Sequence, residues 1–289
     1  MGLPFDVVDV FTDRAYAGNQ LAVVHRAETL TGAQMQAVAQ EFALSETAFT
    51  MPATALGAAY RLRIFTPARE LPFAGHPSIG AAWALASADV IGRGDVVQEC
   101  GAGLLPVRVD ADGAQVSGGA PVVGPDADGA ALAAAVGLRA DDLDPDLSAG
   151  VAAAGVPFAF VAVRPDAVAR CRPDPAAITA GVPGVTGLSV VAVDRAARAV
   201  HARVFCPQVG VVEDPATGSA GVALGVFLGA RGALPDGWAT LTVAQGAEMG
   251  RPSRLEVRVR CADGAAAETV VRGAVRKVAQ GELVALPDP

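Results

Sequence analysis

The stretch that decides the fold is RIFTPARELPFAGHPSIGAAWALA at residues 63–86. Both of its ends recur further along the chain, where RVFCP at 203–207 precedes EDPATGSAGVALGVFLG, which begins at Glu213. A third pair lies upstream of both copies: GNQLAVV begins at Gly18 and GVPFAFVAV begins at Gly155. Three matches in the same order, at a nearly constant offset of roughly 140 residues, indicate an internal repeat.

A repeat close to half of the chain length predicts two pseudo-symmetric domains built from the same unit. The stretch GGAPVVGPDADGA at 118–130 is rich in Gly, Pro and Asp and lies where the first unit ends. We therefore expect half-domains at residues 1–118 and 119–289, with a last strand at about 278–289 that can cross back to the first domain. The cleft between two such domains is the natural place for a ligand.

The repeated strings also predict secondary structure. RLRIF, HARVF and LAVV either alternate or run apolar with β-branched residues, which is typical of strands. Between residues 31 and 42 the apolar positions Met35, Val38 and Phe42 fall at i, i+3 and i+7, which predicts a helix with one buried face.

The runs that follow Gly75 and Glu213 are apolar on almost every side. A helix of this kind belongs in the interior of its domain. Pro77 and Pro215 stand at or near the first helical turn, where a missing N–H group costs nothing. The sequence therefore predicts an α+β fold in which each half-domain is a mixed sheet wrapped around a central buried helix.

Composition excludes several classes of function. The net charge of −8 repels a phosphate backbone and the 22 basic residues are scattered, so we expect no nucleic-acid partner. The 3 histidines and 4 cysteines show no metal-ligand spacing, so we expect no metal. The N-terminal residues lack the basic flank and apolar run of a signal peptide, and charges interrupt the other apolar runs. A cytoplasmic protein without a membrane span follows as an expectation.

No cofactor motif is recognisable either. The Gly-rich segment GAGLLPV at 101–107 lacks the G-x-G-x-x-G fingerprint of a dinucleotide site, and ATGSAG at 216–221 lacks the lysine of a phosphate-binding loop. We therefore expect no nicotinamide, flavin or ATP.

The starts of the two buried helices suggest a chemistry. A helix N-terminus presents unpaired N–H groups and a partial positive charge, so two such ends facing one cleft would hold a carboxylate. Fixed dipoles of this kind stabilise the negative charge that develops when a neighbouring C–H group is deprotonated. The arrangement favours proton transfer beside a carboxylate on a small substrate.

The sequence resembles the PhzF-like isomerases of phenazine biosynthesis, which are similar to diaminopimelate epimerase and share its doubled fold. The resemblance covers nearly the whole chain and rests on five strings in a fixed order. They are DVFTDRAYAGNQLAVV at 9–24, LSETAF at 44–49, RIFTPARELPFAGHPSIG at 63–80, VEDPATGSA at 212–220 and QGAEMGRPS at 245–253.

By this resemblance Glu46 is the general acid and base, and Ser45 is a neighbouring polar contact. The apolar neighbours of Glu46 predict a carboxyl pKa raised towards neutrality. His76 and Asp214 are expected at corresponding places of the two repeats, where the epimerase relatives carry a pair of cysteines. Because neither residue is a cysteine here, we expect Glu46 alone to carry the proton while His76 and Asp214 orient the substrate.

The resemblance also implies the groups that bind the substrate's carboxylate. Gly75, Gly218 and Ser219 match the expected backbone and hydroxyl donors, and Asn19 is a further candidate contact. A homodimer is implied by the resemblance alone.

The expected function is that of a cofactor-independent isomerase that moves a proton on a small carboxylate-bearing substrate. A racemase, epimerase or dehydratase acting on an amino or hydroxy acid could use the same site, since each begins with the same proton removal. A non-catalytic protein that binds carboxylates is the alternative from another class.

Overall fold

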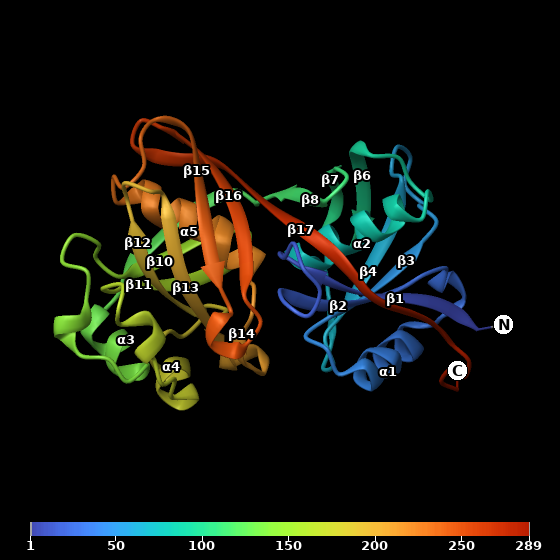
Figure 1. Cartoon of the computed structure of the whole chain (residues 1–289), viewed down its shortest axis with the longest axis horizontal. Coiled ribbons are helices and arrows are strands. Elements are labelled where there is room, and N and C mark those ends of the chain that lie inside the picture. The colour runs from blue at the N-terminus through green and yellow to red at the C-terminus, as the bar shows by residue number, and fades with distance from the viewer. Residues whose placement is uncertain (1, 289) are drawn as a thin grey trace. The chain divides into compact units, whose positions relative to one another are not determined.

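The structure, a computed structural model, describes residues 2–288 and divides into two compact units (Figure 1). Unit 1 contains the residues up to Val116 and those from Arg272 onwards, and unit 2 is Ser117–Val271. The first boundary lies two residues before the position expected from the sequence. The chain rejoins unit 1 at residue 272, whereas the sequence suggested about 278.

The elements of unit 1 follow one another as strands interrupted by helices. They are β1 (Leu3–Val10), β2 (Asn19–Val24), the 3-10 helix η1 (Ala27–Thr29), α1 (Gly32–Phe42), β3 (Thr47–Met51), β4 (Tyr60–Phe65), β5 (Glu70–Leu71), α2 (Gly75–Ser87), β6 (Gly94–Cys100), β7 (Gly103–Val109) and β8 (Gly113–Ser117), whose last residue belongs to unit 2.

Unit 2 opens with a strand in the Gly- and Pro-rich stretch. Its elements are β9 (Pro121–Asp126), α3 (Gly129–Ala135), η2 (Ala140–Asp142), β10 (Gly150–Ala154), β11 (Pro157–Ala162), η3 (Val168–Arg170), α4 (Pro175–Gly181), β12 (Leu188–Asp194), β13 (Ala199–Cys206), η4 (Pro207–Val209), β14 (Val211–Asp214), α5 (Gly218–Ala230), β15 (Gly237–Gln245), η5 (Ala247–Met249) and β16 (Ser253–Ala262). The last strand, β17 (Ala265–Leu283), continues from unit 2 into unit 1.

The order of strand pairing confirms the internal repeat. In unit 1, β1–β2 is antiparallel, β2–β3 parallel, β3–β4 antiparallel, β4–β6 parallel and β6–β7 antiparallel. The strands β10, β11, β12, β13, β15 and β16 of unit 2 pair in the same order and with the same directions. In each unit a short strand, β5 or β14, adds to the strand that carries the repeated motif.

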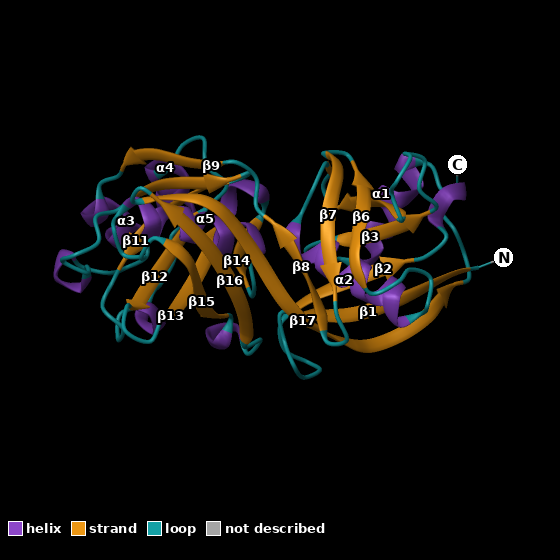
Figure 2. Cartoon of the chain, turned by 90° about the horizontal axis from the view of Figure 1, so that it is seen from above, coloured by secondary structure: helices purple, strands orange, loops and turns teal. Residues whose placement is uncertain are grey.

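Each unit wraps its strands around one helix, as the sequence predicts. Helix α2 contacts β1, β2, β3, β4 and β7, and α5 contacts β9, β10, β11 and β16 (Figure 2). Nearly every residue of both helices is buried. Small residues allow the close approach of helix and sheet: a Cβ atom added at Gly225 would lie 2.5 Å from Cγ2 of Val259. The predicted α+β fold with two pseudo-symmetric halves is therefore confirmed.

Local signals account for the peripheral elements. Helix α1 begins after Thr31, whose hydroxyl accepts from the Gln34 backbone N–H while the Gln34 side chain accepts from the Thr31 N–H. This capping box satisfies two N–H groups that the helix leaves unpaired. The predicted strands 21–24, 61–65 and 201–205 lie within β2, β4 and β13. Among residues 2–288, no helix has the length and apolar character needed to cross a membrane.

The final strand is anchored where it enters unit 1. It pairs with β1 from Val275 opposite Val10 to Leu283 opposite Leu3. Phe11 follows β1 with φ +66°, a left-handed conformation that is uncommon for a residue with a side chain. Its buried ring occupies the space beside Gly273, where an added Cβ atom would lie within 2.4 Å of Phe11 Cδ1. A glycine is therefore required at this point of β17.

Candidate active site

Glu46 and His76 form a close pair in unit 1. Glu46 lies in the short connection between α1 and β3, and His76 is the second residue of α2. Nε2 of His76 lies 3.6 Å from Oε2 of Glu46, and the two side chains are only 6% and 19% exposed. Two groups able to carry a proton are thus held together in a largely dry environment.

Burial raises the pKa of Glu46 to about 7, because desolvation disfavours the charged carboxylate. A hydrogen bond with the Ser45 side chain opposes this rise in pKa but does not cancel it. A carboxyl group of this pKa is populated in both its acidic and its basic form near neutral pH. Such a group can remove a proton and return it without a large energetic penalty in either direction.

Ser45 and Asn19 extend this cluster. The Ser45 hydroxyl donates to Oδ1 of Asn19 at 3.3 Å, and Asn19 is the buried first residue of β2. Gly75, immediately before His76, is the first residue of α2. Five of the predicted site residues therefore belong to one neighbourhood of unit 1 where β2, the β3 connection and α2 begin.

The remaining three predicted residues lie together in unit 2. Asp214 is the last residue of β14, and Gly218 and Ser219 are the first two residues of α5. Between them Thr217 turns its hydroxyl back and donates to Oδ2 of Asp214 at 2.5 Å. The structure thus places the Asp214 carboxylate beside the start of the second central helix.

His76 and Asp214 do not occupy corresponding places in the repeat, so this expectation is wrong. In both units the helix begins at the glycine, Gly75 or Gly218. With these glycines superposed, His76 corresponds to Ser219 and Asp214 corresponds to Leu71 in β5. The two segments differ in length because η4 adds residues between the repeated strand and the helix in unit 2 only.

The starts of the two central helices differ from those of the other α-helices. Side chains cap α1, α3 and α4 at Thr31, Asp128 and Asp174. The N-cap residues of α2 and α5, Ala74 and Thr217, make no side-chain cap hydrogen bond. Uncapped N–H groups at a buried helix start attract an anion. The capping pattern therefore favours a negatively charged ligand at these two ends.

Two buried glutamines that sequence reasoning missed support these helix starts. Gln98 of β6 accepts from the Tyr60 hydroxyl and donates to Ser78 in α2, and Ser78 donates to the carbonyl of Ala74. Gln245 of β15 binds directly to the backbone of the Asp214–Thr217 turn. The motif QGAEMGRPS contains Gln245, but only the strand pairing shows which turn it faces.

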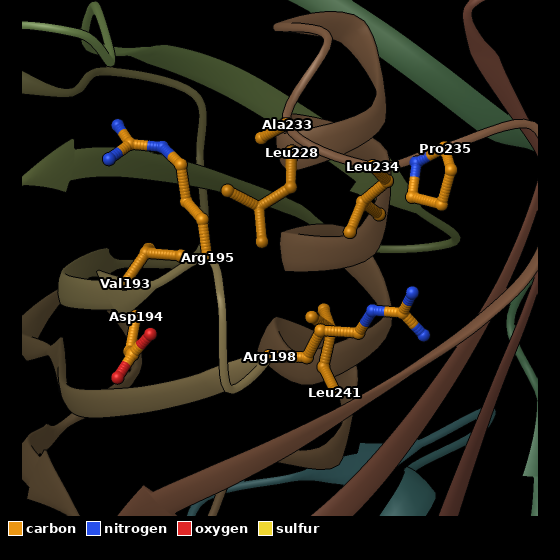
Figure 3. Close-up of a pocket in the computed structure, with 9 residues that line it drawn as sticks. All are labelled: Val193, Asp194, Arg195, Arg198, Leu228, Ala233, Leu234, Pro235 and Leu241. Atoms are coloured by element: carbon orange, nitrogen blue, oxygen red, sulfur yellow. The ribbon is translucent and has the colours of Figure 1, made fainter.

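A separate hollow of about 130 Å³ lies in unit 2 (Figure 3). It is formed by the turn between β12 and β13, Leu228 near the C-terminal end of α5, and the segment that follows α5. The guanidinium of Arg195 at its rim is already bound to Asp144 at 3.1 Å. The lining residues include none of the predicted site residues, and the Asp214 turn lies at the other end of α5.

In the part of the chain that the structure describes, no three His, Cys, Asp or Glu side chains gather in an arrangement that could hold a metal.

Comparison with known proteins places the chain in a family. The PhzC-PhzF model, described as phenazine biosynthesis-like protein, matches residues 8–281. An uncharacterized isomerase of Mesorhizobium japonicum is 37% identical, covering 95% of this chain and 96% of that protein. The trans-2,3-dihydro-3-hydroxyanthranilate isomerase of Pseudomonas aeruginosa is 33% identical, covering 95% and 97%.

Solved structures agree with this assignment. The crystal structure of a Bacillus anthracis phenazine biosynthesis protein of the PhzF family matches with a TM-score of 0.88 at 25% identity, covering 99% of this chain and 100% of that one. The repeat, the paired central helices and the sequence matches thus lead to one conclusion. The chain belongs to the PhzC-PhzF family, as one of its isomerases.

Proposed function

We propose that the protein is a cofactor-independent isomerase in which Glu46 moves a proton between two carbon atoms of a small carboxylate-bearing substrate. The observation that carries this proposal is the Glu46–His76 pair, in which a carboxyl group of pKa about 7 lies 3.6 Å from an imidazole nitrogen. A group of this kind is poised to act as base and then as acid in one catalytic cycle.

The reaction begins with the ionised form of Glu46. Its carboxylate removes a proton from a C–H group that is conjugated with the substrate's carboxylate, and the electron pair moves into the conjugated system. Glu46, now protonated, exchanges its carboxyl proton with solvent, which its 19% exposed side chain permits, and delivers a proton to a different carbon of the same system. No atom is gained or lost overall, which is the balance of an isomerisation.

The anion formed in this step needs stabilisation from fixed donors. The uncapped N–H groups at Gly75 and at Gly218 and the Ser219 hydroxyl are the proposed donors to the substrate's carboxylate. His76 and Asp214 are proposed to orient the substrate, and Ser45 and Asn19 to hold the Glu46 loop in place. Preorganised donors are effective because they need not reorient when charge develops.

The relatives suggest candidate substrates. One relative is named a trans-2,3-dihydro-3-hydroxyanthranilate isomerase, so that compound is the first candidate for this chain. Other small unsaturated, amino or hydroxy acids form the second group of candidates, because a carboxylate next to an acidic C–H group is what the proposed chemistry needs.

The test is turnover in deuterated water. We expect the wild-type protein to convert trans-2,3-dihydro-3-hydroxyanthranilate to an isomer, with deuterium entering only at the carbon that receives the proton. Glu46→Gln should bind the substrate and convert it at least about 100-fold more slowly. The control Glu41→Gln changes an exposed carboxyl group of α1, five residues earlier and outside the proposed site, and should retain wild-type turnover.

The products distinguish the other possibilities. Deuterium in recovered substrate with inverted stereochemistry would indicate a racemase or epimerase, and loss of water would indicate a dehydratase. A protein that binds candidate acids tightly but exchanges no C–H proton in any of them would overturn the proposal in favour of a carboxylate-binding protein.

A further inference from the structure

The side chain of Gln245 binds the Asp214–Thr217 turn through three hydrogen bonds. Its Oε1 accepts from the Thr217 backbone N–H at 3.2 Å. Its Nε2 donates to the Asp214 carbonyl at 2.7 Å and to the Thr217 hydroxyl at 3.1 Å. The side chain is buried, with Gln245 only 2% exposed, so water does not replace these bonds.

These contacts fix the direction of the next hydrogen bond. Because Oε1 accepts from a backbone N–H group, Nε2 must be the end of the amide that faces the Thr217 hydroxyl. The hydroxyl accepts from Nε2 and therefore points its own hydrogen at Oδ2 of Asp214. Gln245 thus determines both where the turn lies and how Thr217 presents its hydroxyl to the carboxylate.

The neighbouring glycine strengthens the contact between the two segments. Gly246 has φ +76°, and an added Cβ atom would lie 2.5 Å from the Pro215 carbonyl oxygen. In unit 1 Gly101 also lies close to the corresponding proline: an added Cβ atom would be 2.9 Å from Cα of Pro72, compared with 3.1 Å between a Cβ atom added at Gly246 and Cα of Pro215. The close approach is therefore a property of the repeat.

The glutamine is not shared between the units. The residue before Gly101 is Cys100. Its side chain has no amide group and cannot make the three hydrogen bonds of the Gln245 side chain. The position that Asp214 occupies in unit 2 is held in unit 1 by Leu71. The glutamine thus occurs in the unit whose turn carries an ionisable side chain, and is absent from the unit whose turn carries a leucine.

We infer that Gln245 is a positioning residue, which holds the Asp214 carboxylate and the first N–H groups of α5 in the geometry that the substrate requires. This inference rests on the proposed function, in which Asp214, Gly218 and Ser219 contact the substrate. Gln245 acts through the turn and does not touch the substrate itself.

The experiment combines hydrogen exchange with kinetics. Gln245→Met keeps the length of the side chain and removes its donor and acceptors. We expect the Thr217 amide to exchange at least about tenfold faster by NMR, because its acceptor is lost. With trans-2,3-dihydro-3-hydroxyanthranilate as the probe, kcat/KM should fall at least about tenfold, since small displacements of orienting groups are costly.

The pH profile separates a positioning role from general damage. In Gln245→Met the pH midpoint of the rise in kcat/KM should remain near 7, because this midpoint reports the ionisation of Glu46 in unit 1. The control is Val243→Ala, a buried position two residues earlier on the same face of β15. It should lower the melting temperature without changing Thr217 exchange or kcat/KM by more than about twofold.

A second variant covers the case in which Gln245→Met does not fold. Gln245→Glu keeps an acceptor for the Thr217 N–H group but loses the donor to the Asp214 carbonyl. Thr217 exchange should then remain within about twofold of wild type while kcat/KM falls about tenfold. Wild-type kcat/KM in both folded variants, or in Gln245→Glu alone if the other is unfolded, would overturn the inference.

The two arms also distinguish this inference from the proposed function. Unchanged Thr217 exchange in Gln245→Met would show that the contact does not constrain the turn, whatever the turnover. A wild-type protein that exchanges no C–H proton would overturn the proposed function, and the positioning role with it, even if Thr217 exchange still responded to the substitution.

Discussion

Nε2 of His76 and Oε2 of Glu46 lie 3.6 Å apart because a parallel strand pair and a buried helix begin at the same end of unit 1. Glu46 directly precedes β3, and His76 stands in the first turn of α2, which packs against β3 and β4. The pair is therefore positioned by regular secondary structure on both sides. Rigid support of this kind keeps a catalytic geometry within narrow limits.

The first prediction concerns the pH dependence of turnover. Only the ionised form of Glu46 can remove a proton, and burial raises the pKa of this group to about 7. We therefore expect kcat/KM to rise as the pH increases from 5 to 8, with a midpoint near 7. An isomerase assay across this range checks it; a midpoint near 4.5, the ordinary glutamate value, would show that burial does not raise the pKa of the catalytic carboxyl group.

The second prediction is that Glu46 destabilises the fold when it is ionised. Its pKa is higher in the folded than in the unfolded state, so the stability that protonation contributes is present below about pH 4.5 and is lost as the pH rises through about 7. Glu46→Gln removes the cost of burying the charge. At pH 8 it should raise the free energy of unfolding by about 3 kcal/mol, which is the rise in pKa from 4.5 to about 7 expressed as free energy.

Urea unfolding at two pH values measures this effect. The gain from Glu46→Gln should shrink towards zero at pH 4.5, where the wild-type carboxyl group is also neutral in the folded state. A gain of equal size at both pH values would instead assign it to packing, and a loss at pH 8 would contradict the raised pKa.

The third prediction compares equivalent arginines of the repeat. Arg203 binds Glu213 through two bonds of 2.8 Å, donates to the Cys171 carbonyl and has a side chain only 7% exposed. Arg63 binds Glu70 in the same way at 2.7 Å, but both partners are partly exposed.

Removing Arg203 leaves the Glu213 carboxylate poorly solvated and without its ion-pair partner. The Cys171 carbonyl also loses its hydrogen-bond donor. Arg203→Met should therefore cost about 3–5 kcal/mol of unfolding free energy, whereas Arg63→Met should cost about 1 kcal/mol. Denaturant titration of the two variants is the measurement, and equal losses would mean that burial does not distinguish the pairs.

The fourth prediction concerns the packing of α5. Gly225→Ala adds a Cβ atom 2.5 Å from the stiff side chain of Val259 and should lower the free energy of unfolding by about 1–2 kcal/mol, despite the higher helix propensity of alanine. Gly181→Ala at the end of α4 is the matched control. Its new Cβ atom would lie 3.7 Å from Leu132, so stability should be unchanged or slightly raised. Thermal unfolding of both variants checks the difference.

Much of the fold could be predicted because of the repeat. A strand or helix recognised in one half is supported by the matching segment in the other half. RIFTP and RVFCP mark β4 and β13, and the apolar runs that follow mark α2 and α5. Apolar periodicity and a capping residue also located α1. Each of these signals lies within a short stretch of sequence, where residue propensity and apolar periodicity can be recognised without knowledge of the tertiary structure.

Other features depend on pairings that the sequence does not display. The Gly and Pro content of residues 118–130 predicts a domain boundary, yet the middle of this stretch forms β9, which pairs with β10. The Arg63–Glu70 and Arg203–Glu213 pairs have different spacings, because η4 occurs only in unit 2. Because the arginine and glutamate are separated by different numbers of residues in the two repeats, the sequence alone does not show that they form equivalent pairs.

In the candidate site, too, some residues could be recognised from local sequence motifs and others only from strand pairing. The motif around Glu46 and the two glycine turns identified residues that the structure places in two compact clusters. Gln245 and Gln98 were missed because a buried glutamine in a strand resembles any other polar residue in sequence. Their importance comes from the backbone groups that they face, and these are known only once β6 and β15 have been placed beside β4 and β13.

The course of β17 bears on how the molecule is made. Residues from Arg272 onwards complete the sheet of unit 1 by pairing along β1, so unit 1 cannot be completed until all of unit 2 has been synthesised. Until then one side of β1 is an open strand edge, a surface that favours association with other chains. A nonsense mutation at or before codon 272 would therefore harm a unit whose other residues are encoded more than 150 codons earlier.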